Sequence, residues 1–142
     1  MSLAPERIGI GIRRHFTTAG IHPYDELVWE RRDARISNYR DGSVAFEQLA
    51  VEFPVTWSFN ATNIVAQKYF RGRLGSDERE SSVRQMVGRV SGTIAGWGRD
   101  GGYFASDEDA DAFEAELTHI LLHQVAAFNS PVWFNVGFPD TP

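Results

Sequence analysis

The stretch VRQMVGRVSGTIAGW, residues 83–97, sets the architecture of this chain because it carries the clearest helical pattern in the sequence. Its large apolar residues recur at steps of three and four: Val83, Met86, Val87, Val90, Ile94 and Trp97. That spacing predicts an amphipathic helix with one face buried. Asp77 is predicted as its N-cap, because Glu80 follows at capping-box spacing. The glycine-rich residues 98–102 are predicted to end it.

Two more helices and a β-hairpin are predicted around this helix. One helix covers about residues 58–70, and another begins after Ser106, an N-cap followed by three acidic residues. Residues 27–53 are predicted as β structure with a hairpin turn at Asp41-Gly42, although a helix over 24–36 remains an alternative. Alternating isoleucines predict a short extended segment within residues 6–22. The predicted fold class is mainly α with a small antiparallel β-hairpin, in one domain over 1–142.

The composition predicts a globular chain and argues against several classes of partner. The 142 residues are 42% hydrophobic, which is enough for one modest core. The net charge is −5 and the basic residues are scattered, so a nucleic-acid-binding surface is not expected. There is neither a bilayer-length apolar run nor a signal peptide, so we expect a cytoplasmic protein without a membrane partner. The chain contains no cysteine, which excludes disulfides and cysteine nucleophiles within it.

Two motif matches have simpler explanations than a binding site. Gly96, Gly98 and Gly101 form a G-x-G-x-x-G pattern. A dinucleotide site needs that loop between a strand and a helix, whereas here it ends a helix. Four glutamates could in principle supply acid–base chemistry, but nothing in the sequence pairs them, and a solvated face is expected: Glu26, Glu30, Glu47 and Glu52.

Glu116, His119 and His123 are predicted to share one face of the helix that follows Ser106. Glu-x-x-His is half of the motif that binds two iron ions in helical bundles. The sequence offers no second copy of that motif, and histidines at a helix edge are more often packing groups. We therefore assign no metal ligand, and the role of the three residues stays open.

The stretch AFNSPVWFNVG, residues 127–137, closes the patterned part of the chain. Ser130 before Pro131 predicts an N-cap with proline at the first helical position, and Gly137 would end a very short helix. A strand over residues 132–136 is the alternative, because those residues favour β structure. In the helical case, the Ser130 hydroxyl and the free amides after it would form an anion site.

Four blocks of the sequence resemble the N-terminal region of the adenosylcobalamin-dependent (class II) ribonucleotide reductases. The blocks follow the family's order: HPYDELVWERRDARI (22–36), VEFPVTWSFNATNIVAQKYFRG (51–72), VRQMVGRV (83–90) and LLHQVAAFNSPVWFNVG (121–137). The last block is the most specific, since other reductase classes have Ser/Thr-Pro, an apolar run and Asn-x-Gly at the corresponding place.

The resemblance implies an enzyme that reduces ribonucleotides to deoxyribonucleotides with a thiyl radical, which adenosylcobalamin generates inside a ten-stranded α/β barrel. It also implies a thioredoxin-type reductant and a homodimer for the full-length enzyme, with a nucleoside diphosphate as the expected substrate. Ser130 matches the family's serine or threonine that contacts the substrate phosphate. No catalytic or cofactor-binding residue is carried over.

The family's cysteines, barrel and cobalamin surface lie beyond the resembling region. We therefore expect this chain to be a fragment that is inactive alone, does not bind adenosylcobalamin and works with the remainder of the reductase chain. One alternative is a stand-alone helical interaction or regulatory module. A weaker alternative is a metal-binding helical protein that uses Glu116, His119 and His123.

Overall fold

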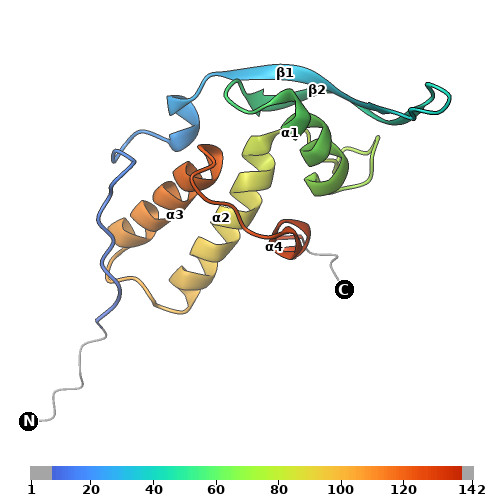
Figure 1. The fold of residues 1–142 in the computed structure, drawn as a ribbon. Helices are drawn as coiled ribbons and strands as arrows, with labels where there is room; N and C mark the ends of the chain where they lie inside the picture. The colour runs from blue at the N-terminus through green and yellow to red at the C-terminus, as the bar shows by residue number, and fades with distance from the viewer. Residues whose placement is uncertain (1–7, 139–142) are drawn as a thin grey trace, which may run out of the picture.

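The computed structural model describes residues 8–138, which form helices packed beside one two-stranded hairpin (Figure 1). In chain order the elements are η1 (Pro23–Glu26), β1 (Trp29–Ser37), β2 (Val44–Pro54), α1 (Phe59–Ile64), the π-helical turn η2 (Val65–Tyr69), α2 (Val83–Asp100), α3 (Asp107–Leu122) and α4 (Ser130–Asn135). Helices α2 and α3 lie side by side, and the far end of the hairpin projects beyond the helices (Figure 1). The predicted fold class is confirmed.

The hairpin forms where it was predicted, with Asp41 and Gly42 in the connection between β1 and β2. The alternative helix over residues 24–36 is wrong, because only the single 3-10 turn η1 forms there. The segment is a strand because it pairs with β2. Its side chains alternate as in a strand: Arg32 and Ala34 are buried, and the residues beside them are exposed. The Arg32 guanidinium donates to the Thr62 hydroxyl at 2.8 Å, which ties the hairpin to α1.

Helix α2 begins at Val83, so the predicted N-cap at Asp77 is wrong. Ser82 is the N-cap and forms a reciprocal capping box with Gln85. The Glu52 amide of β2 donates to the Ser81 carbonyl at 2.8 Å, and Glu52 also pairs with Ser82 in a parallel bridge. These contacts keep residues 81 and 82 extended, which prevents the helix from starting earlier. The other end follows the prediction, because α2 stops at Gly101.

The other two helices begin where they were predicted, and the predicted cap at Ser106 is confirmed. Ser58 accepts a hydrogen bond from the Ala61 amide, and Ser106 accepts one from the Asp109 amide. Residues 6 and 7 of the expected extended segment lie outside the described residues. In the rest of that segment only Ile10 pairs, through an isolated bridge to Phe104.

The core lies where β2, η2, α2, α3 and α4 meet. Its buried members are Ala34, Val51, Phe53, Trp57, Ala66, Phe70, Val83, Met86, Val87, Val90, Leu121, Leu122 and Trp133. Trp57 links β2 to α3, since its ring packs edge-on against Phe53 and its indole N–H donates to the Leu122 carbonyl at 2.7 Å. Through Trp133, helix α4 is therefore part of the core.

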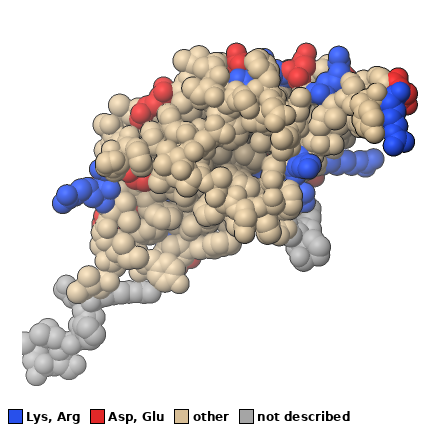
Figure 2. Space-filling model, in the orientation of Figure 1, with Lys and Arg blue, Asp and Glu red and all other residues tan. Residues whose placement is uncertain are grey.

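Charged residues are dispersed over the surface. On the face shown in Figure 2, Lys and Arg lie at separate places around the rim, and several have Asp or Glu beside them. Three of the four glutamates considered above form ion pairs: Glu30 with Arg32, Glu47 with Arg35, and Glu52 with Arg84. These carboxylates are engaged by arginines and do not converge on one site.

Candidate functional site

Within residues 127–137, Ser130–Asn135 form the short helix α4, so the alternative strand over residues 132–136 is wrong. The N-cap is Asn129, which makes no side-chain capping bond, and the prediction of Ser130 as N-cap is therefore wrong by one residue. Asn129 is extended, at φ −72° and ψ 166°, and its carbonyl accepts from the Val132 amide. Ser130 is the first helical residue, with Pro131 behind it.

The Ser130 hydroxyl is directed at Tyr69, the last residue of the turn η2. The two hydroxyl oxygens lie 2.8 Å apart and are hydrogen-bonded. The Tyr69 ring also stacks on Phe134, with ring centroids 5.3 Å apart and an interplanar angle of 17°. Because Ser130 and Phe134 are four residues apart, they share one face of α4, and Tyr69 packs against that face.

Helix α4 is held at its start by a bond to the segment just before it and at its end by α2. At the start, the Trp133 indole N–H donates to the Phe128 carbonyl at 3.0 Å. After the helix, Arg89 of α2 donates to the Val136 carbonyl at 2.8 Å. The Arg89 guanidinium also pairs with Glu80 at 2.9 Å, and both side chains are about nine-tenths buried. These bonds therefore hold helix α4, and with it Ser130, in place.

A mainly apolar cavity of about 240 Å³ lies beside this site. Its walls include Trp57, Tyr69, Met86, Phe128 and Trp133. Both indole N–H groups already have backbone acceptors. The cavity walls thus offer mainly apolar contacts. Tyr69 lines the cavity and is also hydrogen-bonded to Ser130.

Glu116, His119 and His123 lie along one face of α3, but they act as internal contacts. The Glu116 carboxylate accepts from the backbone amides of residues 15–17 and from the Thr17 hydroxyl. His119 stacks between Phe16 and His123, with ring centroids 4.7 and 3.9 Å away. Burial and the neighbouring His123 lower the pKa of His119. Within residues 8–138, no cluster of His, Cys, Asp and Glu has the geometry of a metal site.

Glu116 should hold the segment before η1 against α3 in a pH-dependent way. Burial alone would raise the pKa of Glu116, but hydrogen bonds from Thr17 and from the amides of residues 15–17 outweigh it and lower the pKa below its ordinary value. A carboxyl with a lowered pKa stabilises the folded state above its ordinary pKa, and this contribution is lost as the pH falls through the folded value. Amide exchange of residues 15–17 should therefore lose protection as the pH falls below the ordinary pKa of a glutamate, about 4.3.

The Glu116→Gln variant should expose the same segment at neutral pH. Trypsin should cleave after Arg14 faster in this variant than in the parent chain. Glu108→Gln is the matched control, since Glu108 lies in the first turn of the same helix and is exposed. Equal cleavage rates for the two variants would contradict the assigned role of Glu116.

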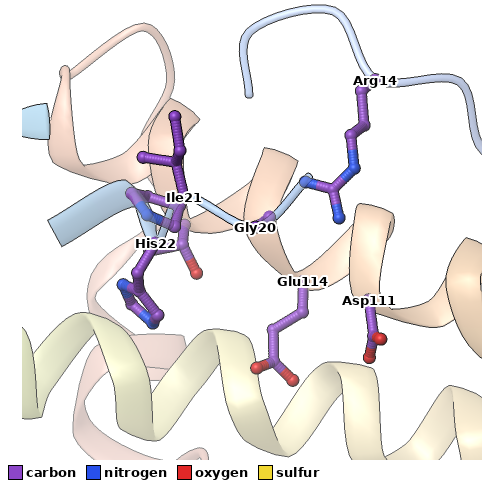
Figure 3. Close-up of a pocket in the computed structure, with 9 residues that line it drawn as sticks. Arg14, Gly20, Ile21, His22, Asp111 and Glu114 are labelled. Atoms are coloured by element: carbon purple, nitrogen blue, oxygen red, sulfur yellow. The ribbon is translucent and has the colours of Figure 1, made fainter. Parts of the chain in front are cut away.

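A second pocket, of about 340 Å³, lies between α3 and the segment before η1 (Figure 3). In the close-up, the carboxylates of Asp111 and Glu114 point away from the helix on which they lie, and Arg14 stands opposite (Figure 3). Arg99 of α2 donates to both carboxylates, at 2.8 and 2.9 Å. These charges are already paired within the protein, so we assign no ligand to this pocket.

Sequence reasoning singled out Ser130 but not its hydrogen-bond partner Tyr69. The only local signal for Tyr69 is its place at the end of a predicted helix, and its partner lies 61 residues away in the sequence. The contact depends on how η2 and α4 pack, which no short motif encodes.

No helix of the described residues is both long and apolar enough to cross a membrane.

The comparisons with known proteins agree on one family. A model of the family described as class II vitamin B12-dependent ribonucleotide reductase matches residues 30–78 and 73–124. The chain is 56% identical over 132 residues to the vitamin B12-dependent ribonucleotide reductase of Streptomyces coelicolor, and 57% identical to that of Streptomyces avermitilis. Both matches cover 93% of this chain but only 14% of the relative.

A more distant relative extends the match. The vitamin B12-dependent ribonucleotide reductase of Rhodopirellula baltica is 45% identical over 138 residues, which is 96% of this chain and 13% of the relative. The chain thus spans about one seventh of the length of the curated relatives it matches. The resemblance in the four sequence blocks is confirmed, and the chain belongs to the class II vitamin B12-dependent ribonucleotide reductase family.

Proposed function

We propose that this chain is the N-terminal domain of a cytoplasmic reductase that converts ribonucleotides to deoxyribonucleotides for DNA synthesis. The identity of 56% to a full reductase, over 14% of its length, supports this assignment. The chain has no cysteine, so the thiol chemistry of the reaction belongs to the remainder of the enzyme. The domain itself packs beside the catalytic barrel and is inactive alone.

Within the enzyme, Ser130 contacts the phosphate end of the substrate. The observation that carries this proposal is the anchoring of α4: its ends are tied by Trp133 and Arg89, and the Ser130 hydroxyl is oriented by Tyr69. A hydroxyl held in this way can donate to a phosphate oxygen with little loss of side-chain freedom on binding. The match of Ser130 to the family's phosphate-contacting residue supports the same role.

Adenosylcobalamin would supply the radical that starts the reduction, and we do not expect the described residues to bind it. The pocket between Ser106 and the segment before η1 has a volume of about 640 Å³, but acidic residues of α3 line it. The cavity beside Tyr69 is apolar but measures only about 240 Å³. Neither provides the broad apolar wall that a corrin ring needs. We therefore expect the cobalamin site in the remainder of the enzyme.

The role of Ser130 can be tested in the full-length reductase. Ser130→Ala should weaken binding of a ribonucleoside diphosphate by about 1–3 kcal/mol, because a hydrogen bond to a charged group is lost. Equilibrium dialysis with the diphosphate measures the effect. The unphosphorylated nucleoside is the control ligand, and its affinity should not change.

Ser130→Thr is the matched variant, since it keeps the hydroxyl and should bind nearly as well as the parent enzyme. An unchanged diphosphate Kd in Ser130→Ala would disprove the phosphate contact. Equal losses for the diphosphate and the nucleoside would also contradict it, because the defect would then not concern the phosphate.

A further inference from the structure

Tyr69 occupies an unusual backbone position for a residue that contacts the site. It ends the π-helical turn η2, where the Phe70 amide bonds to the Val65 carbonyl at 3.0 Å. Such turns are rare in proteins, and those that occur are often found at functional sites. Here the turn brings the Tyr69 hydroxyl to Ser130 and its ring to Phe134.

The two hydroxyls form an isolated pair. Within the described part of the chain, Tyr69 Oη and Ser130 Oγ have only each other as hydrogen-bond partners. Each hydroxyl carries one proton, and their mutual bond uses one of the two. The pair therefore keeps one proton that can be donated to a third group.

The chemistry of the two groups decides which proton is kept. A phenol is a stronger hydrogen-bond donor than an aliphatic alcohol, so we assign the shared proton to Tyr69. A hydroxyl that accepts a hydrogen bond becomes a better donor, because the bonds polarise one another. The proton of Ser130 is then both free and strengthened as a donor.

We propose that Tyr69 is a positioning residue for substrate binding: its hydroxyl donates to Ser130 Oγ and thereby directs the Ser130 proton at a phosphate oxygen of the nucleotide. This inference rests on the proposed phosphate contact of Ser130. Stacking on Phe134 fixes the phenol, so the direction of the hydroxyl pair is set before the ligand arrives. Tyr69 itself does not touch the substrate.

Tyr69→Phe in the full-length reductase is the test, because it removes the hydroxyl and keeps the ring on Phe134. The Kd for a ribonucleoside diphosphate should rise about two- to fivefold, as expected for one neutral hydrogen bond. KM should rise by a similar factor with kcat unchanged, since the contact is the same in the bound substrate and the transition state. Tyr103→Phe is the matched control and should change neither value, because Tyr103 is 62% exposed and lies outside the site.

A double-mutant cycle separates positioning from general packing. In the Ser130→Ala background, Tyr69→Phe should cause no further loss of affinity, because Tyr69 acts only through Ser130. Additive losses would overturn the inference, as would an unchanged Kd in Tyr69→Phe alone. With either result, weaker diphosphate binding by the Ser130→Ala variant would still support the phosphate contact. An unaffected Ser130→Ala variant would remove both proposals.

Discussion

Replacing Arg89 with alanine should lower the free energy of unfolding of the chain by about 3–5 kcal/mol, the range found when one partner of a buried ion pair is removed. Arg89 and Glu80 are 8% and 11% exposed at their side chains. Without Arg89, the Glu80 carboxylate keeps only the Arg71 amide at 2.8 Å as a described donor. The Val136 carbonyl also loses its arginine, so the end of α4 is weakened in the same variant. Urea denaturation monitored by tryptophan fluorescence measures the loss.

Arg99→Ala is the matched control for this prediction. Arg99 lies on the same helix and pairs with Asp111 and Glu114, but all three side chains are at least 38% exposed. An exposed pair contributes about 0–1 kcal/mol, so this variant should stay close to the parent chain. The double variant Glu80→Met/Arg89→Met should be more stable than Arg89→Ala, because it leaves no unpaired buried charge. Similar losses for Arg99→Ala and Arg89→Ala would contradict the assignment.

The buried pair also explains why the start of α2 was predicted incorrectly. Two neighbouring stretches have capping-box spacing, Asp77 with Glu80 and Ser82 with Gln85. Two contacts outside the helix decide between them. The Ser81–Ser82 stretch is held beside β2, and Glu80 is used by Arg89. The cap at Ser106 has no such competition, and it was predicted correctly.

The geometry of the candidate site was predictable to the same depth. The short helix after Asn129 and its Ser-Pro start follow from local signals, with an error of one residue at the cap. The face shared by Glu116, His119 and His123 follows from helical periodicity, but their partners do not. Glu116 binds a segment about 100 residues earlier, and Tyr69 lies 61 residues from Ser130. Contacts at such separations depend on tertiary packing, which composition and periodicity do not specify.

Gly137→Ala should weaken the docking of α4 by about 2–5 kcal/mol, because strain and overlap add. Gly137 has φ +78°, which disfavours a residue with a side chain. A methyl group there would lie 2.5 Å from Thr93 Oγ1 and 2.8 Å from the Arg89 carbonyl oxygen. The backbone oxygen of α2 cannot move aside as a flexible side chain could. The segment after α4 must therefore shift away from Arg89, and the bond to Val136 is lost with it.

Gly75→Ala separates backbone strain from steric overlap. Gly75 has a similar φ of +85°, but a methyl group there would have nothing within 4 Å. It should lose only about 1–2 kcal/mol, the strain of the left-handed conformation. Amide exchange locates the effect: in Gly137→Ala the Val136 amide, bonded to the Val132 carbonyl, should lose protection while the middle of α2 keeps it. In the full-length reductase this variant should also weaken diphosphate binding, because Ser130 is carried by the helix that shifts. Unchanged exchange at Val136 would show that the chain accommodates the methyl group and that α4 is not held by this close approach.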